Sequence, residues 1–253
     1  MGHVISISNQ KGGVGKTTTT INLAASIAAG ERDCLLIDCD PQGNATTGLG
    51  VDPASLEQGL YDILFAELPP EEAITETPLP RLHLIGATGN LIGAEVEMAS
   101  KKSKEFRLRN AIAALRQRYD YIFLDCPPSL GFLTINALTA AESVLVPLQC
   151  EYYALEGLSQ LLTTAKAVKR GLNPVLRSAR ILLTMYDSRN NLSHQVEDEA
   201  RALFKERVFK TVIPRNVRLS EAPSYGKPII LYDIASKGAQ SYLALARELI
   251  GRE

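Results

Sequence analysis

The chain has 253 residues, of which 45% are hydrophobic and 22% are charged, and its formal net charge is −1. These values are typical of a soluble globular protein that buries its core in one large domain or two small ones. They argue against a transmembrane or secreted protein, because no apolar run approaches the roughly 18 residues of a membrane span and the first residues lack a signal-peptide pattern.

Hydrophobic runs alternate along the chain with longer segments of helical periodicity. The runs that predict strands are 3–8, 34–39, 82–86, 121–126, 143–148 and 179–185. The segments that predict helices are 16–29, 103–118, 132–141, 155–170, 192–206 and 237–250. Strands that are hydrophobic throughout are buried on both faces, so this alternation predicts a doubly wound α/β fold with a mostly parallel sheet flanked by helices.

The domain organisation follows from the same pass along the chain. Residues 66–82 are rich in proline and acid and are interpreted as an exposed connection. With no repeat, low-complexity segment or interdomain linker, residues 1–253 are expected to form a single domain.

The cysteines lack a Cys-x-x-Cys pair, so we expect no zinc site or disulfide and a reducing, cytoplasmic environment. They are Cys34, Cys39, Cys126 and Cys150.

The stretch SNQKGGVGKTTTT, residues 8–20, lies between the first predicted strand and the first predicted helix. Its glycines allow a tight turn with inward-pointing N–H groups, and the dipole of the following helix favours phosphate. Lys16 is expected to reach the β and γ phosphates, the Thr17 hydroxyl to ligate magnesium, and Thr18 to bond the α-phosphate. The predicted nucleotide-binding residues of this loop are Gly12, Gly13, Val14, Gly15, Lys16, Thr17 and Thr18.

One position departs from the usual phosphate-loop pattern G-x-x-x-x-G-K-[ST]. The first glycine of that pattern falls on Gln10, and Lys11 opens the loop instead. A second lysine beside the phosphates would stabilise the charge that develops on a transferred phosphoryl group. Binding to the chain's own nucleotide and simple exposure to solvent are the alternative roles of Lys11.

Three aspartates lie at the ends of two predicted strands. Asp38 and Asp40 lie at the end of the second strand, and Asp125 lies near the end of the run YIFLDC. In a doubly wound sheet, the carboxyl ends of the strands face the crevice where ligands bind. With Thr17, Asp38 and Asp125 are therefore candidate magnesium ligands, and helix capping is the alternative role.

The loop K-G-G-x-G-K-T resembles the deviant Walker A motif of the ParA/MinD group of P-loop ATPases. The resemblance implies an ATPase that uses ATP and magnesium and that is a homodimer when ATP is bound. In that dimer, Lys11 reaches the phosphates of the other subunit. The resemblance makes Asp125 the Walker B residue, places Asp38 near the metal and has Asp40 orient the attacking water. The implied catalytic residues are Lys11, Lys16 and Asp40.

Three later segments narrow the resemblance. LVPLQCEYYALEGL (145–158), LLTMYDSRNNLS (182–193) and VIPRNVRLSEAPSYGKPI (212–229) are similar to segments of chromosome-partitioning ParA proteins of the Soj type. The similarity implies that Thr184 and Met185 lie close to the adenine base. It implies that the base is wrapped by Pro214, Arg215, Asn216 and Val217.

Charge is distributed unevenly along the chain. Residues 166–218 carry twelve Lys and Arg against five Asp and Glu, whereas the remainder carries fifteen against twenty-three. This basic segment is either a solvated surface or a contact surface for a polyanion. Because Soj-type proteins bind double-stranded DNA nonspecifically as ATP-bound dimers, the resemblance implies DNA contacts by Arg189 and Arg218. Secondary candidates are Lys205, Arg207 and Lys210.

The resemblance therefore implies a cytoplasmic, nucleoid-associated ATPase of chromosome or plasmid segregation. Its hydrolysis is expected to be slow alone and stimulated by a ParB-type centromere-binding protein. No membrane partner is expected, because SYLALARELIGRE lacks a basic-aromatic amphipathic tail. The alternatives are a related ATPase that positions a division site, a flagellum or other cargo, and a regulatory DNA-binding protein whose ATPase times its occupancy.

Overall fold

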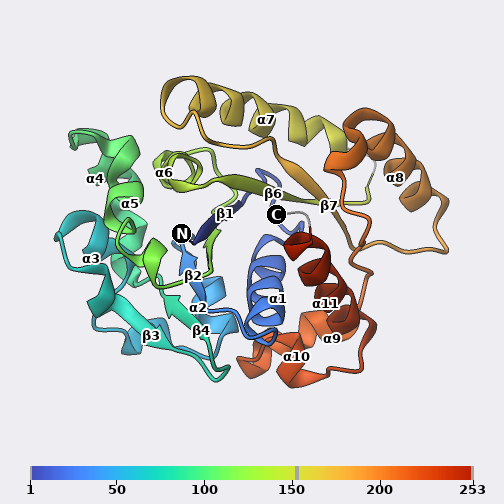
Figure 1. The fold of residues 1–253 in the computed structure, drawn as a ribbon, viewed down its shortest axis with the longest axis horizontal. Helices are drawn as coiled ribbons and strands as arrows, with labels where there is room; N and C mark the ends of the chain where they lie inside the picture. The colour runs from blue at the N-terminus through green and yellow to red at the C-terminus, as the bar shows by residue number, and fades with distance from the viewer. Residues whose placement is uncertain (1, 152–153, 252–253) are drawn as a thin grey trace.

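Strands between His3 and Thr184 form one sheet. The computed structural model describes residues 2–151 and 154–251. Within these residues the strands are β1 (His3–Ile7), β2 (Cys34–Asp38), β3 (Ile74–Glu76), β4 (Leu82–Ile85), β5 (Tyr121–Asp125), β6 (Ser143–Gln149) and β7 (Arg180–Thr184). They lie side by side in the order β3–β4–β2–β5–β1–β6–β7 (Figure 1).

The sheet is parallel except at one edge, where β3 runs antiparallel to β4. Strands β2 and β5 are buried along their full length, as expected for central strands covered on both faces. The register sets Asp125 of β5 beside both Asp38 of β2 and Ile7 of β1. The two carboxylates therefore meet at the carboxyl ends of the central strands.

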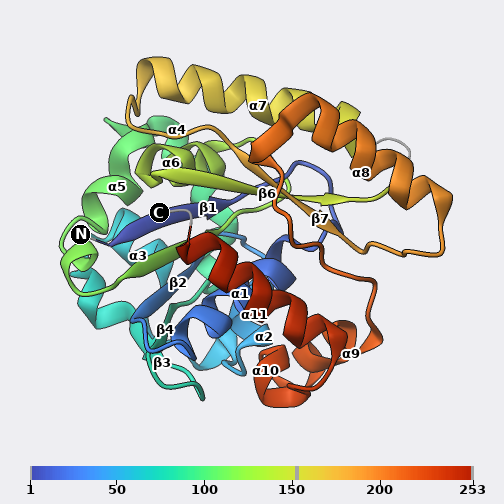
Figure 2. The same cartoon turned by 45° about the vertical axis from the view of Figure 1, so that its right-hand side comes forward.

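Helices cover both faces of the sheet. They are α1 (Lys16–Ala28), α2 (Asn44–Gly48), α3 (Leu60–Phe65), α4 (Ala94–Ser100), α5 (Arg107–Ala111), α6 (Phe132–Ala140), α7 (Ala154–Gly171), α8 (Asn191–Phe204), α9 (Val217–Glu221), α10 (Ile229–Tyr232) and α11 (Lys237–Ile250). One apolar cluster joins the sheet to α3 through α8, and a second joins it to α1, α2 and α9 through α11 (Figures 1 and 2). Alternate strand residues divide between the clusters: Leu35 and Ile37 belong to the first and Leu36 to the second. The predicted doubly wound α/β fold is confirmed.

Each predicted strand matches an observed strand to within one residue at either end, but one predicted helix is wrong and one predicted connection contains a further strand. Residues 103–118 are not one helix, because α5 is flanked by two separate 3-10 turns. The N–H of Leu108 there donates to the Asn136 side chain of α6, so a tertiary contact replaces a helical bond. Residues 66–82 are more than a connection, because they contain β3. That strand is too short to show a periodic pattern, and its pairing with β4 defines it.

The outer edge of β7 is covered by the chain that follows α8. The N–H of Phe209 donates to the Ile181 carbonyl, and the N–H of Ile213 donates to the Leu183 carbonyl, both at 2.9 Å. Beyond the strand, the N–H of Tyr186 donates to the Ile213 carbonyl at 3.0 Å. This pairing carries the residues after Ile213 to the carboxyl end of β7.

Candidate nucleotide and DNA site

The loop between β1 and α1 contains two glycines in the left-handed backbone conformation, which glycine adopts without strain. Gly13 and Gly15 have φ angles of 73° and 89°. Gly15 is the N-cap of α1, so the first N–H groups of that helix have no intrahelical partner and suit an anion. Lys16 is buried, and its Nζ donates to the Lys11 carbonyl at 3.2 Å. Burial lowers the pKa of Lys16, and the charge of Asp125 opposes this shift.

Hydroxyl groups hold the two strand-end carboxylates. Thr17 and Thr20 of α1 donate to the two oxygens of Asp125 at 2.8 and 2.7 Å. Asp38 accepts from the N–H and the hydroxyl of Thr46 at 2.8 and 2.7 Å. Both carboxylates are fully buried. Thr17 therefore connects the phosphate loop directly to Asp125, as a shared metal site requires.

The Asp38–Asp125 pair fits a magnesium ion. Burial raises the pKa of Asp125 to about 7 and that of Asp38 to about 6, and the charge of Asp38 adds to the shift at Asp125. A cation nearby would favour the ionised form of both. Carboxylate and hydroxyl oxygens suit Mg²⁺, which takes one or two carboxylates together with phosphates rather than an all-protein cage. In keeping with this, no group of three or more His, Cys, Asp or Glu in the described residues could hold a metal.

Asp40 lies on the wall of a cavity of about 480 Å³ in front of the phosphate loop. Its carboxylate accepts from the Gln42 N–H at 3.0 Å, and its own N–H donates to Asp38 at 3.2 Å. The predicted residues on this wall are Gly12, Gly13, Gly15, Lys16, Thr17, Thr18, Asp40 and Met185. Val14 is not on the wall, and its carbonyl instead accepts from the Thr184 hydroxyl at 2.8 Å.

A second cavity, of about 460 Å³, adjoins the first and shares Gly15, Thr18, Met185 and Pro223 with it. Its wall contains the residues predicted to lie around the base, namely Thr184, Met185, Pro214, Arg215, Asn216 and Val217. Met185 has a φ of 50°, a strained conformation for a residue with a side chain. The fold therefore places the phosphate loop and the predicted base residues around two neighbouring cavities that share lining residues.

Lys11 lies outside the walls of both cavities. Its side chain is 40% exposed, and its Nζ pairs with Glu151 at 2.9 Å. The Gln149 side chain also donates to Glu151, so this carboxylate has two partners. Lys11 therefore does not reach its own phosphate cavity in this structure. The tyrosines that follow Glu151 in the segment 145–158 lie outside the described residues.

Arg189 and Arg218 lie on the surface, and each is paired with a carboxylate. The Arg189 side chain is 88% exposed and contacts both oxygens of Asp187, at 3.0 and 2.9 Å. These bonds lower the pKa of Asp187 to about 2. Arg218 pairs with Glu221 at 2.8 Å and with Asp233 at 3.6 Å. Arg189 lies in the loop just before α8, and Arg218 lies in α9. The start of α8 and the whole of α9 are on the same side of the molecule, away from α3 (Figures 1 and 2).

The secondary basic candidates follow α8. Lys205 and Lys210 are exposed, and the Arg207 guanidinium lies over the Phe204 ring at 5.2 Å.

The C-terminal helix α11 is a packing element, as predicted. It buries Tyr242, Leu245 and Leu249 in the cluster that contains α1, and the Tyr242 hydroxyl hydrogen-bonds to Thr19 at 3.1 Å. Among the described residues, none of the helices combines the length and hydropathy needed to cross a bilayer.

Several residues contact this site although the sequence did not indicate them. Thr20 and Thr46 hold the carboxylates, and Lys227 lines the phosphate cavity. The run TTTT, residues 17–20, shows that several hydroxyls follow Lys16. Only their positions on helix α1 determine that Thr20 is one of those that reach Asp125. Nothing in the sequence joins Lys11 to Glu151, because 140 positions separate them.

Comparisons with known proteins agree with this geometry. A family described as an AAA domain matches residues 2–178. The chain is 60% identical over 253 residues to the chromosome partitioning protein ParA of Myxococcus xanthus, covering 100% of this chain and 89% of the relative. It is 57% identical over 249 residues to the sporulation initiation inhibitor protein Soj of Bacillus subtilis, covering 98% of each. A solved cobyrinic acid a,c-diamide synthase of Mycobacterium smegmatis, with bound ADP and magnesium, is 37% identical with a TM-score of 0.87 over 99% of this chain and 94% of that chain.

Proposed function

Because the chain belongs to the ParA/Soj family of chromosome-partitioning P-loop ATPases, we propose that ATP joins two copies of it into a homodimer that binds double-stranded DNA nonspecifically. A ParB-type centromere-binding protein would stimulate hydrolysis of the bound ATP and return the protein to a monomer. The protein would act in the cytoplasm, associated with the nucleoid, as a single ATPase domain. The shared sheet of all described strands supports the single domain.

The position of Lys11 is the observation that supports an ATP-dependent dimer. The phosphate cavity already has its own cation in Lys16, whereas Lys11 is partly exposed and is neutralised by Glu151 outside the cavity. A lysine placed there can meet nucleotide bound to a second copy. If the partner's phosphates replace Glu151 as its counterion, Lys11 supplies positive charge where negative charge develops during transfer.

Within one chain, each predicted residue has a distinct task. Lys16 and the N–H groups of the loop would bind the phosphates, while the magnesium ligands would be Thr17, Asp38 and Asp125. Magnesium, when bound, neutralises phosphate charge and polarises the transferred phosphoryl group. Asp40 would orient the attacking water from the cavity wall. Met185 and residues 214–217 would enclose the adenine in the adjoining cavity.

Arg189 and Arg218 would contact DNA phosphates. Both arginine side chains are more than half exposed, and an ion pair with that exposure contributes little to stability. A phosphate can therefore replace Asp187 at Arg189, or Glu221 and Asp233 at Arg218. Contacts of this kind read the backbone of the duplex rather than its sequence.

Sedimentation of an Asp40→Ala variant tests this function. Without the residue that orients water, ATP should bind but persist, so the variant should sediment as a dimer with ATP and as a monomer without it. Addition of an unrelated duplex should shift only the ATP sample. Lys16→Ala, which lacks the phosphate-binding cation, should stay monomeric and is the control. A monomeric Asp40→Ala protein that is saturated with ATP would refute the dimer.

A further inference from the structure

Tyr186 connects two parts of the site. One is the second cavity, which is lined by Met185 and residues 214–217 and is called the base cavity from here on. The other is the loop that contains Arg189. Its N–H donates to the Ile213 carbonyl and its carbonyl accepts from the Arg215 N–H, both at 3.0 Å. Together these bonds form an isolated parallel bridge between Tyr186 and Pro214. A shift of the segment that encloses the base is therefore transmitted to the Tyr186 backbone.

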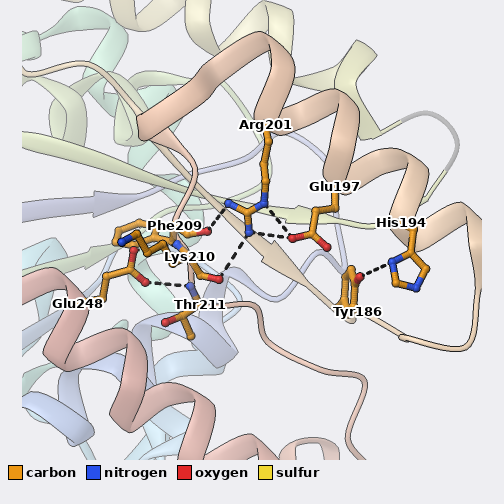
Figure 3. Close-up of polar contacts among 8 residues, drawn as sticks. All are labelled: Tyr186, His194, Glu197, Arg201, Phe209, Lys210, Thr211 and Glu248. Atoms are coloured by element: carbon orange, nitrogen blue, oxygen red, sulfur yellow. Dashed lines mark hydrogen bonds and ion pairs between the residues drawn. The ribbon is translucent and has the colours of Figure 1, made fainter.

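The side chain of Tyr186 extends this connection to α8. Its hydroxyl and His194 Nδ1 are 2.9 Å apart, and the two ring planes are nearly perpendicular, at 85°. Figure 3 shows the Tyr186 side chain of the loop reaching the His194 ring of the helix. His194 Nε2 lies 2.9 Å from the Ser188 carbonyl, to which it must donate. With Nε2 protonated, the neutral imidazole leaves Nδ1 as an acceptor for the Tyr186 hydroxyl, which also hydrogen-bonds to Glu197 of the same helix. Burial and the hydrogen bond with Glu197 raise the pKa of Tyr186 to about 12, so the hydroxyl retains its proton.

Arg189 belongs to the loop that this pair closes. Asp187 Oδ1 accepts from the Arg189 N–H and Nε, both at 3.0 Å, and Asp187 Oδ2 accepts from the guanidinium at 2.9 Å. The Asp187 N–H in turn donates to the Ser193 hydroxyl of α8 at 3.3 Å. The direction of the guanidinium therefore depends on the conformation of the loop between Tyr186 and α8.

The C-terminal half of α8 contacts residues 209–211, which precede the base-enclosing residues 214–217. Arg201 donates to the carbonyls of Phe209 and Lys210 at 3.2 and 3.5 Å (Figure 3). Glu248 of α11 accepts from the N–H groups of Lys210 and Thr211 at 2.7 and 2.8 Å. Residues 209–211 are therefore held by both α8 and α11. If residues 214–217 move around the base, the movement is concentrated at the Tyr186–Pro214 bridge, because the residues before it are held.

We propose that the Tyr186–His194 pair is a positioning pair that couples nucleotide in the base cavity to the DNA contact of Arg189. A bound base fixes the Tyr186–Pro214 bridge, and the pair then holds the loop with Arg189 directed for phosphate. This inference rests on the proposed function, because it requires both ligands. Neither Tyr186 nor His194 lines either cavity, so the pair acts through other residues.

The test measures coupling rather than affinity alone. The affinity for a labelled random-sequence duplex is measured by fluorescence anisotropy, with a hydrolysis-resistant ATP analogue and with ADP. The ratio of the two affinities should fall about threefold to tenfold in Tyr186→Phe, the value of one hydrogen bond. Nucleotide affinity and the salt dependence of DNA binding should not change, because no group that touches either ligand is removed.

Three further variants make the measurement specific. His194→Asn can keep a hydrogen-bonding group near Nδ1 and should lose less coupling than His194→Ala. Tyr61→Phe removes a hydroxyl that bonds to Glu97 at 2.9 Å on α3 and α4, and is the matched control. It should keep the wild-type ratio.

The possible failures are distinguishable. A wild-type ratio in Tyr186→Phe, or a fall equal to that of Tyr61→Phe, would overturn the positioning pair alone. A loss of nucleotide affinity that accounts for the whole effect would also overturn it, since the residue would then be structural for the cavity. If the wild-type protein binds DNA equally with both nucleotides, the proposed function fails first and the inference falls with it.

Discussion

Asp38 and Asp125 are suited to a cation and destabilise the fold when none is bound. Burial raises their pKa values to about 6 and about 7, above the roughly 3.9 of an unfolded aspartate. Between these values the folded chain binds more protons than the unfolded chain. Stability from this pair is therefore complete below the unfolded pKa and is lost as the pH rises through the folded values.

At the residue scale we expect pH to change stability in the absence of nucleotide and magnesium. Lowering the pH from about 8 to about 6 should raise the free energy of unfolding by about 1–2 kcal/mol through this pair. Asp125→Asn should be more stable than the wild type at the higher pH, with a shallower pH dependence. Urea unfolding at both pH values measures this, and the exposed Glu57→Gln is the control. Parallel pH curves for Asp125→Asn and the wild type would refute the assignment.

Sequence context predicted the residues whose neighbours in the chain define their role. Lys16 and Asp125 were placed because a glycine-rich turn precedes one and a buried strand leads to the other. Thr46 and Glu151 were not predicted, because their roles depend on contacts with Asp38 and Lys11 across the fold. The roles in catalysis and binding remain predictions.

Helices α9 and α11 pack closely against each other beside the base cavity. Gly238 lies in α11 where a Cβ would meet Leu219 Cγ of α9 at 2.6 Å. Leu219 is itself on the wall of the base cavity, and its N–H is capped by Asn216. The glycine therefore permits α11 to hold the base-enclosing segment in place.

At the element scale we expect Gly238→Ala to displace α9. Overpacking of this kind lowers the free energy of unfolding by about 1–3 kcal/mol. ATP affinity should fall as well, because Leu219 and Asn216 move with α9. Gly157→Ala in α7 has open space around its new methyl group and should instead be neutral or stabilising by up to about 1 kcal/mol. Thermal unfolding and fluorescent-nucleotide titration give both values, and an unchanged Gly238→Ala protein would contradict the packing argument.

Elements were predictable where hydrophobic continuity or amphipathic periodicity was long enough. Strands β2 and β5 and helix α11 satisfy that condition and match their predicted ranges closely. The segment 103–118 has a helical pattern but packs as separate turns against α6, and β3 has only three residues. Such elements depend on tertiary partners, which no local pattern contains.

At the scale of the whole molecule, the uneven charge matters more than the net charge of −1. We expect Arg189→Glu to lose DNA affinity while it still dimerises with ATP. The slope of log affinity against log salt should become shallower by about one for each phosphate that the variant no longer neutralises. Arg81→Glu is the matched control, because Arg81 also pairs with an aspartate, Asp33, but lies outside the basic segment. Equal DNA affinities of Arg189→Glu and the wild type across salt concentrations would reassign the surface.

The overall architecture was predictable because alternating buried strands and helices permit few arrangements. The meeting of Met185 with residues 214–217 was not predictable from spacing, and only the resemblance to Soj-type proteins indicated it. Its structural origin is the pairing of the chain after α8 with β7.

That pairing also covers part of a sheet edge at which aggregation could start. Strand β7 ends the sheet, and an uncovered edge strand invites pairing with another chain. The bonds from Phe209 and Ile213 occupy part of this edge without any ligand. These bonds lie outside the Tyr186–Pro214 bridge, so nucleotide release that moves the bridge and the residues beyond it would leave the sheet edge covered. Repeated cycles of ATP binding and release would then carry little risk of misassociation through this edge.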